Sequence, residues 1–142
     1  QPQPYPEWMQ ELLQVVMPCL GITDPEVYPD SCNLNWYRYG QDSVQWHADS
    51  EALFQGLHTP VRIVSLTMGA GRAFRVRANW RNGPEVSQVL MDGDLCLMDG
   101  WFQKHFVHCV PKERMPTGER FNLTWRWIRQ HKGGCRAAAP SE

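Results

Sequence analysis

Hydrophobic positions change their spacing along this chain, and the change separates a short helical beginning from a long region of strands. At first the spacing is helical, which predicts one amphipathic helix that ends near Pro18 and Gly21. The apolar positions of this helix are Trp8, Leu12, Leu13, Val15 and Val16. Farther along, apolar and polar residues alternate as in strands, with turn residues such as Asp92-Gly93 between the segments. The predicted strands are 32–39, 61–68, 73–77, 86–90, 94–98, 105–109 and 120–128. One helix followed by many short strands predicts a mainly β fold, an antiparallel sandwich or jelly roll.

The length and composition limit what kind of protein this is. A chain of 142 residues suits one domain. Residues 132–142 have no core-forming pattern, so we expect a flexible C-terminal tail. No apolar run is long enough to span a bilayer, and we predict no membrane partner. The five cysteines lack disulfide or zinc spacing, which favours a reducing, intracellular compartment. The chain does not begin with methionine, so we expect a fragment of a longer protein.

Charge is unevenly distributed, although the net charge is only −1. Residues 1–60 carry a net charge of −7, whereas residues 61–142 carry +6. Four arginines of the second half lie close together in sequence: Arg72, Arg75, Arg77 and Arg81. This asymmetry permits a basic face toward a polyanion such as nucleic acid. A solvated strand edge with alternating arginines would explain the same residues.

The strand predicted from residue 120 separates polar from apolar side chains completely. Alternation places Phe121, Leu123 and Trp125 on one face and four polar residues on the other. The polar set is Arg120, Asn122, Thr124 and Arg126. These polar groups would be costly against a dry core, so they either line a cavity with a ligand or buried partners, or form an exposed face. The strand alone leaves both interpretations open.

A second pattern combines His47, Asp49 and a later histidine, His108. Two imidazoles and one carboxylate, two of them separated by a single residue, are the ligands that hold Fe(II) on one face and leave positions open for chemistry. By the period-two rule His47 and Asp49 share a strand face, and Glu51 continues it. Arginine forks suit the carboxylates of a small dicarboxylate co-substrate, so the combination predicts an oxygenase and not a hydrolase. A histidine that is satisfied within the core remains an alternative for His108.

The segment before the first histidine adds hydrogen-bonding groups. Asn35, Tyr37 and Tyr39 fall on one face by alternation, and their amide and phenol groups can bind a carboxylate or a keto acid. Tyr37 fits equally well as a core aromatic residue with a tethered hydroxyl. Three further histidines lack an acid at ligand spacing and are interpreted as surface or structural residues: His58, His105 and His131.

Taken in order, these motifs resemble the AlkB-type Fe(II)- and 2-oxoglutarate-dependent dioxygenases, in particular their nucleic-acid demethylase branch. The resemblance runs from about Asn33 to Trp127. It rests on Asn35-Trp36-Tyr37, Trp46-His47-Ala48-Asp49-Ser50-Glu51, Ile63-Val64-Ser65-Leu66, His105-Phe106-Val107-His108 and Arg120-Phe121-Asn122-Leu123-Thr124-Trp125-Arg126. Ser50 stands where close relatives often carry another acid. Trp125 replaces a commoner phenylalanine, a change that we expect to be tolerated on an outer face.

The resemblance implies a double-stranded β-helix core over residues 1–131 that uses Fe(II), 2-oxoglutarate and O2. It assigns the iron to His47, Asp49 and His108. It assigns the carboxylates of 2-oxoglutarate to Arg120 and Arg126. The residues that complete the co-substrate pocket would be Asn35, Tyr37, Asn122 and Thr124. Glu51 would lie near the target base and accept a hydrogen bond from its exocyclic amine.

The implied reaction is oxidative demethylation of N-alkylated bases in DNA or RNA, as in alkylation repair, with release of succinate, CO2 and formaldehyde. We expect a monomer whose partner is nucleic acid. We also expect that the recognition lid, which the family places before this segment, is missing. Two alternatives remain open: a 2-oxoglutarate hydroxylase or demethylase that acts on protein, and a catalytically degenerate jelly-roll binding module.

Overall fold

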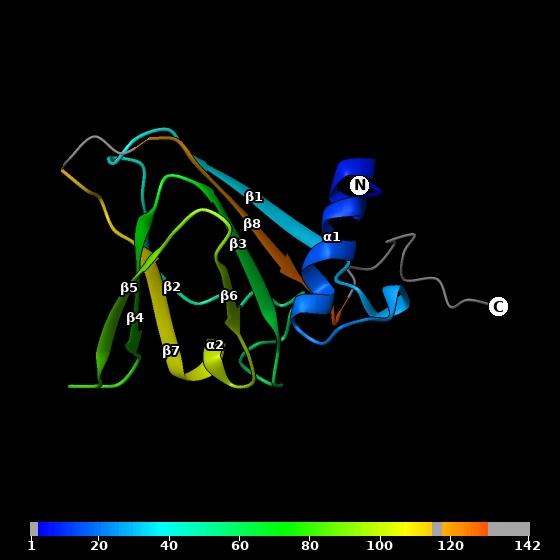
Figure 1. The fold of residues 1–142 in the computed structure, drawn as a ribbon. Coiled ribbons are helices and arrows are strands. Elements are labelled where there is room, and N and C mark those ends of the chain that lie inside the picture. Colours follow the sequence, from blue (N-terminus) through cyan, green and yellow to red (C-terminus); the bar gives the residue numbers. More distant parts are fainter. Residues whose placement is uncertain (1–2, 115–117, 131–142) are drawn as a thin grey trace.

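The computed structural model describes residues 3–114 and 118–130, and the predicted tail 132–142 and His131 lie outside these ranges. The described residues form two four-stranded antiparallel sheets with an N-terminal helix (Figure 1). The elements are α1 (Glu7–Cys19), the 3-10 helix η1 (Pro25–Val27), β1 (Ser31–Tyr37), β2 (Val44–His47), β3 (Ile63–Gly69), β4 (Arg72–Ala78), β5 (Glu85–Leu90), β6 (Leu95–Met98), α2 (Phe102–His105), β7 (Phe106–Val110) and β8 (Arg120–Arg126). Within the described ranges, no helix has the length and apolar character needed to cross a membrane.

The order of the strands confirms the predicted jelly roll. One sheet has the order β1-β8-β3-β6 and the other has the order β2-β7-β4-β5. Among the described strands, β4 and β5 alone follow each other within one sheet, as a hairpin, and every other connection crosses to the opposite sheet. This alternation winds the chain into a double-stranded β-helix, with the two sheets facing each other (Figure 1).

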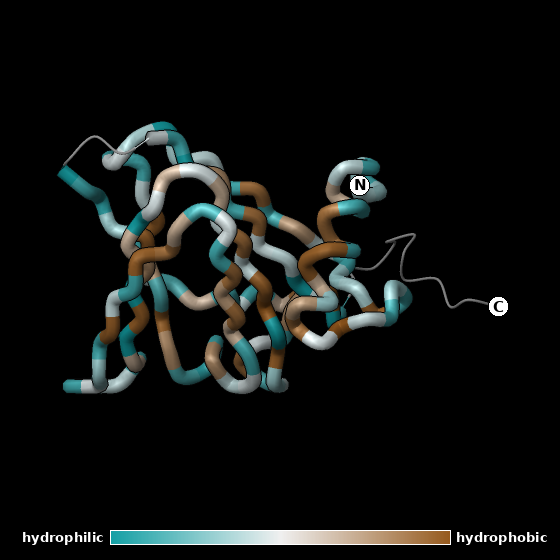
Figure 2. The backbone as a smooth tube through the Cα atoms, viewed as in Figure 1, coloured by the Kyte–Doolittle hydropathy of each residue, from teal (hydrophilic) through white to brown (hydrophobic). Residues whose placement is uncertain are grey.

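The apolar face of β8 is buried under helix α1. Strand β8 lies between β1 and β3, and its Leu123 and Trp125 are fully buried in a core cluster that includes Val16 and Met17 of the helix. Figure 2 shows hydrophobic stretches along α1 and along the strands beside it. The expectation that Trp125 lies on a tolerant outer face is therefore wrong, because the helix makes this face part of the core.

The predicted helix is present, but it packs through partly different residues. Its buried side chains are Met9, Leu13, Val16 and Met17. Trp8 and Val15, which belong to the predicted apolar set, are 49% and 68% exposed. The apolar residues of this helix cover more than one face, and contact with the sheet selects the stripe with helical spacing.

All the predicted strands form, with ends shifted by no more than two residues. The sequence pattern missed β2 and the short helix α2. Strand β2 has only four residues, too few for alternation to be distinctive. His105 was expected inside a strand, but it is the last residue of α2, and β7 begins at the next residue. Tyr39 lies beyond the end of β1 and is 47% exposed, so it does not share the face of Tyr37.

The four clustered arginines do not form one surface. Arg72 is 1% exposed, and its guanidinium donates to four backbone carbonyls in the loops after β1 and β7. Arg75, Arg77 and Arg81 are exposed. A basic face that includes Arg72 is therefore wrong, because this arginine holds two loops together inside the protein. Arg75 and Arg77 alternate along β4, as expected for the outward side of a strand.

Candidate metal centre and adjoining pocket

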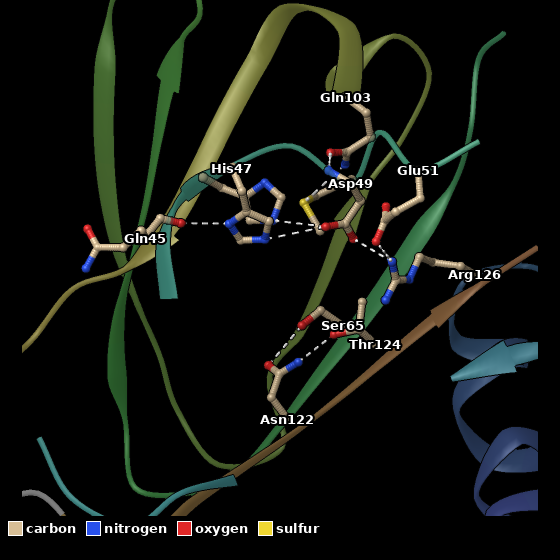
Figure 3. A network of polar contacts seen from close by, with 11 residues as sticks. Gln45, His47, Asp49, Glu51, Ser65, Gln103, Asn122, Thr124 and Arg126 are labelled. Carbon is tan, nitrogen blue, oxygen red and sulfur yellow. Dashed lines mark hydrogen bonds and ion pairs between the residues drawn. The ribbon is translucent and has the colours of Figure 1, made fainter. Parts of the chain in front are cut away.

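The three predicted metal ligands meet between the two sheets. His47, at the end of β2, is paired with His108 of β7, and their ring centroids are 4.2 Å apart. Oδ1 of Asp49 lies 3.4 Å from Nε2 of His47 and 3.9 Å from Nε2 of His108. One ligand atom from each residue lies within 4.8 Å of the others, which is compact enough for a shared metal ion. Figure 3 shows the His47 ring and the Asp49 carboxylate directed toward each other.

Asp49 reaches this position from a loop. Strand β2 ends at His47, so the expected strand face shared by His47, Asp49 and Glu51 is wrong. The backbone N–H of Asp49 donates to Oε1 of Gln103 in α2 at 2.9 Å, in a buried hydrogen bond (Figure 3). Phe54, in the same loop, packs under the guanidinium of Arg126. Contacts with other elements, and not strand alternation, direct this carboxylate toward the histidines.

The protonation states of Asp49 and His108 favour metal binding, whereas the metal would have to displace a proton from His47. Burial and the neighbouring His47 imidazole lower the pKa of His108 to about 4, so that its ring is neutral near pH 7. A hydrogen bond with Asp49 raises the pKa of His47 above its usual value, and its Nδ1 lies 2.8 Å from the Gln45 carbonyl oxygen. Burial opposes ionisation of Asp49, but the His47 hydrogen bond and the Arg126 charge hold its pKa below the usual value. The site therefore offers an ionised carboxylate and two imidazoles whose Nε2 atoms face that carboxylate.

The metal centre opens into a cavity of about 240 Å³ between the sheets. Every residue that the sequence assigned to the site lines this cavity: Asn35, Tyr37, His47, Asp49, Glu51, His108, Arg120, Asn122, Thr124 and Arg126. The register of β1 against β8 brings several of them together, since Asn35 is paired with Asn122 and Tyr37 with Arg120. The polar face of β8 is therefore a cavity wall, and the exposed-face interpretation of this strand is wrong.

Arg120 is a buried cation with unused hydrogen-bonding capacity. It is 1% exposed, and its Nη2 donates to Oγ1 of Thr67 at 2.9 Å and to Oδ1 of Asn122 at 2.6 Å. Its Nε and Nη1 are buried and have no hydrogen-bond partner in the part of the chain that the structure describes. In the described residues, no carboxylate forms an ion pair with it. Buried charges and donors require partners, so this end of the cavity suits a small anion such as a carboxylate.

Arg126 lies at the other end of β8, beside the metal centre. Its Nη1 is 3.4 Å from Oδ2 of Asp49 and 3.4 Å from Oε1 of Glu51 (Figure 3). Its Nε is buried and has no hydrogen-bond partner among residues 3–114 and 118–130. The side chain of Glu51 is 55% exposed, which leaves its carboxylate accessible from solvent. Its contact with a target base stays a prediction.

Hydrogen bonds order the wall between the two arginines. Nδ2 of Asn122 donates to Oγ1 of Thr124 at 2.7 Å, and Oγ of Ser65 donates to Oδ1 of Asn122 at 3.0 Å. The Arg120 guanidinium lies 5.0 Å from the ring centre of Tyr37. Burial raises the pKa of Tyr37, although Arg120 opposes this shift, so that the phenol keeps its proton and can donate a hydrogen bond. The roles of these residues in ligand binding stay predictions.

Sequence reasoning missed three buried polar residues of the site. Ser65 and Thr67 lie on β3, opposite Thr124 and Asn122, and contact the β8 wall. Their alternation with apolar residues in a predicted strand was a signal that could have identified them. Gln103 gave no such signal, because α2 was not predicted and the contact with Asp49 joins residues 54 positions apart.

Comparison with known proteins agrees with this geometry. Residues 1–126 match the family described as the 2OG-Fe(II) oxygenase superfamily. The chain is 33% identical over 134 residues to alpha-ketoglutarate-dependent dioxygenase alkB homolog 3 of Bos taurus, covering 89% of this chain and 45% of that protein. It is 31% identical over 121 residues to the DNA oxidative demethylase ALKBH2 of Arabidopsis thaliana, covering 70% of this chain and 38% of that protein.

A bacterial relative and a solved structure extend the comparison. The chain is 32% identical over 133 residues to the alpha-ketoglutarate-dependent dioxygenase AlkB homolog of Caulobacter vibrioides, covering 89% of this chain and 56% of that protein. The solved structure of OsALKBH1 superposes with a TM-score of 0.62 at 21% identity, covering 89% of this chain and 66% of that one, and supports the fold. This chain spans between 38% and 56% of the length of these curated relatives. On the family match and these relatives, the chain belongs to the 2OG-Fe(II) oxygenase superfamily, in its AlkB-type branch.

Proposed function

We propose that this chain is the core of an Fe(II)- and 2-oxoglutarate-dependent demethylase of N-alkylated bases in DNA or RNA, releasing succinate, CO2 and formaldehyde. The observation that carries the proposal is one cavity with the His47, Asp49 and His108 ligands at one side and the buried, partly unpartnered Arg120 at another. A metal centre and an anion site that share a cavity are what a metal-chelating dicarboxylate requires.

Different side chains of the site would bind the iron and the co-substrate. His47, Asp49 and His108 would hold the iron, because two imidazoles and one carboxylate leave other metal positions free. Arg120 would bind the distant carboxylate of 2-oxoglutarate through Nε and Nη1, the two nitrogens that have no partner within the described ranges. Bound iron, 2-oxoglutarate and O2 supply the oxidation. The chain's own residues orient these reactants and exclude water from the cavity.

The wall of the cavity supports this orientation. Asn35, Tyr37, Asn122 and Thr124 offer amide and hydroxyl groups along the cavity between Arg120 and Arg126. Phe74 and Val110 contribute apolar lining from the opposite sheet, and Met98 contributes it from β6 of the same sheet. A partly apolar, enclosed site strengthens the electrostatic contacts of the arginines with carboxylates, because little water competes for them.

The substrate class follows from the relatives and from the open side of the site. The Arabidopsis thaliana relative is named as a DNA oxidative demethylase. Glu51 is a partly exposed acceptor beside the metal centre, suited to an exocyclic amine of a methylated base. A base within a duplex would have to be flipped out to reach it. We further propose a monomer in a reducing, intracellular compartment that keeps the iron as Fe(II), and nucleic acid as its partner.

The test is formaldehyde release from four methylated substrates assayed side by side: single-stranded DNA, duplex DNA, RNA and a peptide. We expect release from at least one nucleic acid, in stoichiometry with succinate. His108→Ala is the matched control, and it should abolish both products because a metal ligand is lost. Reaction with the peptide alone would replace this proposal by the protein-directed alternative.

A second measurement separates the enzyme from a binding module with the same fold. Anaerobic addition of Fe(II) and 2-oxoglutarate should produce a weak visible charge-transfer band when the co-substrate binds to the metal. The band should be absent in His108→Ala. If the wild-type protein shows neither the band nor succinate formation, the degenerate binding module is the better description.

A further inference from the structure

Asp49 differs from the other two proposed metal ligands in how its backbone is held. His47 and His108 lie on adjacent strands and are paired with each other. Asp49 lies two residues beyond β2, where the strand no longer constrains it. A carboxylate on a loop can complete a metal site only if another part of the protein fixes the loop.

Gln103 makes the contact that fixes this backbone. Its Oε1 accepts the N–H of Asp49 at 2.9 Å, and its side chain is 1% exposed. The helix that carries Gln103, α2, leads directly into β7, the strand of His108. The glutamine therefore couples the loop of one metal ligand to the strand of another. Figure 3 shows Gln103 above Asp49, on the side away from Arg126.

The packing around Gln103 shows a close fit to this loop. A Cβ added to Gly56 would lie 3.0 Å from Cβ of Gln103 and 3.1 Å from the carbonyl oxygen of Asp49. The loop thus comes close to α2 at a glycine, and larger residues would push the two apart. The other polar contact of Gln103 is weak, since its Nε2 lies 3.6 Å from Sδ of Met98. Burial of a glutamine is therefore explained mainly by its bond to Asp49.

The carboxylate of Asp49 also forms an ion pair with Arg126, on the side away from the histidines. Nη1 of Arg126 lies 3.4 Å from its Oδ2, while Oδ1 faces the two histidines. Without a fixed backbone, the ion pair with Arg126 could turn the carboxylate away from the imidazoles. The geometry points to Gln103 as a positioning residue that holds Asp49 so that its Oδ1 completes the metal site. This inference rests on the metal-binding role proposed above.

Cobalt(II) titration of the metal-free protein tests the inference without any turnover. Gln103→Met keeps the length and much of the volume of the side chain but removes the acceptor. We expect the Kd for Co(II) to rise about 10- to 100-fold, the usual effect of losing a group that orients a metal ligand. The visible Co(II) spectrum should change as well, because the coordination by Asp49 is altered. Gln103→Glu retains an acceptor oxygen at the same reach and should bind Co(II) more tightly than Gln103→Met.

The matched control is Val16→Ala, which removes volume from the core beneath α1, on the other face of the sheet. It should lower the Tm but leave the Co(II) affinity and spectrum unchanged. If Gln103→Met lowers the Tm without changing the Co(II) Kd, or if Val16→Ala weakens Co(II) equally, the positioning role is wrong. If the wild-type protein does not bind Co(II), the metal site itself fails and the inference fails with it.

Discussion

Replacing Arg120 by methionine is expected to weaken 2-oxoglutarate binding strongly while leaving the stability of the fold nearly unchanged. Arg120 is 1% exposed and makes two hydrogen bonds to neutral groups, and its Nε and Nη1 find no hydrogen-bond partner among the described residues. In the free protein this is an unfavourable arrangement for a cation, because no carboxylate among the described residues pairs with it. The arrangement becomes favourable when an anionic ligand supplies the missing acceptors.

The expected loss of 2-oxoglutarate binding is larger than the expected change in the stability of the fold. A hydrogen bond to a charged group contributes about 1.5–3 kcal/mol, so the loss of a two-pronged contact should cost roughly 2–4 kcal/mol of binding, or a ~30- to 1000-fold higher Kd. Removing Arg120 also removes two hydrogen bonds that the same charged group donates within the protein, together worth roughly 3–6 kcal/mol. The gain from no longer burying a charge offsets this loss, so the free energy of unfolding should change by no more than about 1 kcal/mol.

The assay combines succinate formation as a function of 2-oxoglutarate concentration with thermal unfolding of the metal-free protein. Arg75→Met is the control, since Arg75 is an exposed arginine on the outward side of β4 and should change neither quantity. Arg120→Lys keeps the charge but loses the planar fork, and should fall between the wild type and Arg120→Met. A collapse of the Tm with an unchanged requirement for 2-oxoglutarate would show that Arg120 is structural and would refute the reasoning.

Three further predictions follow from the geometry. The affinity for Co(II) should fall about tenfold for each pH unit below the raised pKa of His47, because the metal must displace a proton from this imidazole. His108 has a pKa of about 4 and is already neutral above about pH 5, so only the proton of His47 should be displaced there. A slope near two in a plot of log Kd against pH would mean that two protons are displaced, and would contradict the neutral state of His108. Trp125→Ala should destabilise the protein by about 3–5 kcal/mol in urea unfolding, since it empties the core under α1, and a loss below about 1 kcal/mol would restore the outer-face interpretation. Gly69→Ala should lower the Tm more than Gly93→Ala. Both glycines have positive φ, so both substitutions strain the backbone. A Cβ at Gly69 would also clash with the backbone of Glu119, just before β8, whereas a Cβ at Gly93 would lie in open space. Equal losses would show that backbone strain alone accounts for both.

Much of the fold and site could be predicted because strand alternation is a local property. The polar residues of β8 share one face because the segment is a strand, independently of what packs against it. The same alternation places Asn35 and Tyr37 on one face of β1. The order of the motifs then indicated the family, and with it the double-stranded β-helix. Alternation did not locate Asp49, because the chain leaves β2 before reaching it.

The sequence by itself determined which residues of each strand share a face and which side chains could bind a metal and a dicarboxylate. Only the tertiary structure decided which faces are covered and by what. Apart from the exposed Phe121, both faces of β8 are buried, one by α1 and the other as the wall of the cavity, so polarity alone could not show that Trp125 is core. Arg72 was indistinguishable in sequence from the exposed Arg75, and its burial depends on carbonyl groups from distant loops. The position of Asp49 likewise depends on Gln103, because a loop takes its conformation from the groups that satisfy its backbone, and these groups are far away in sequence.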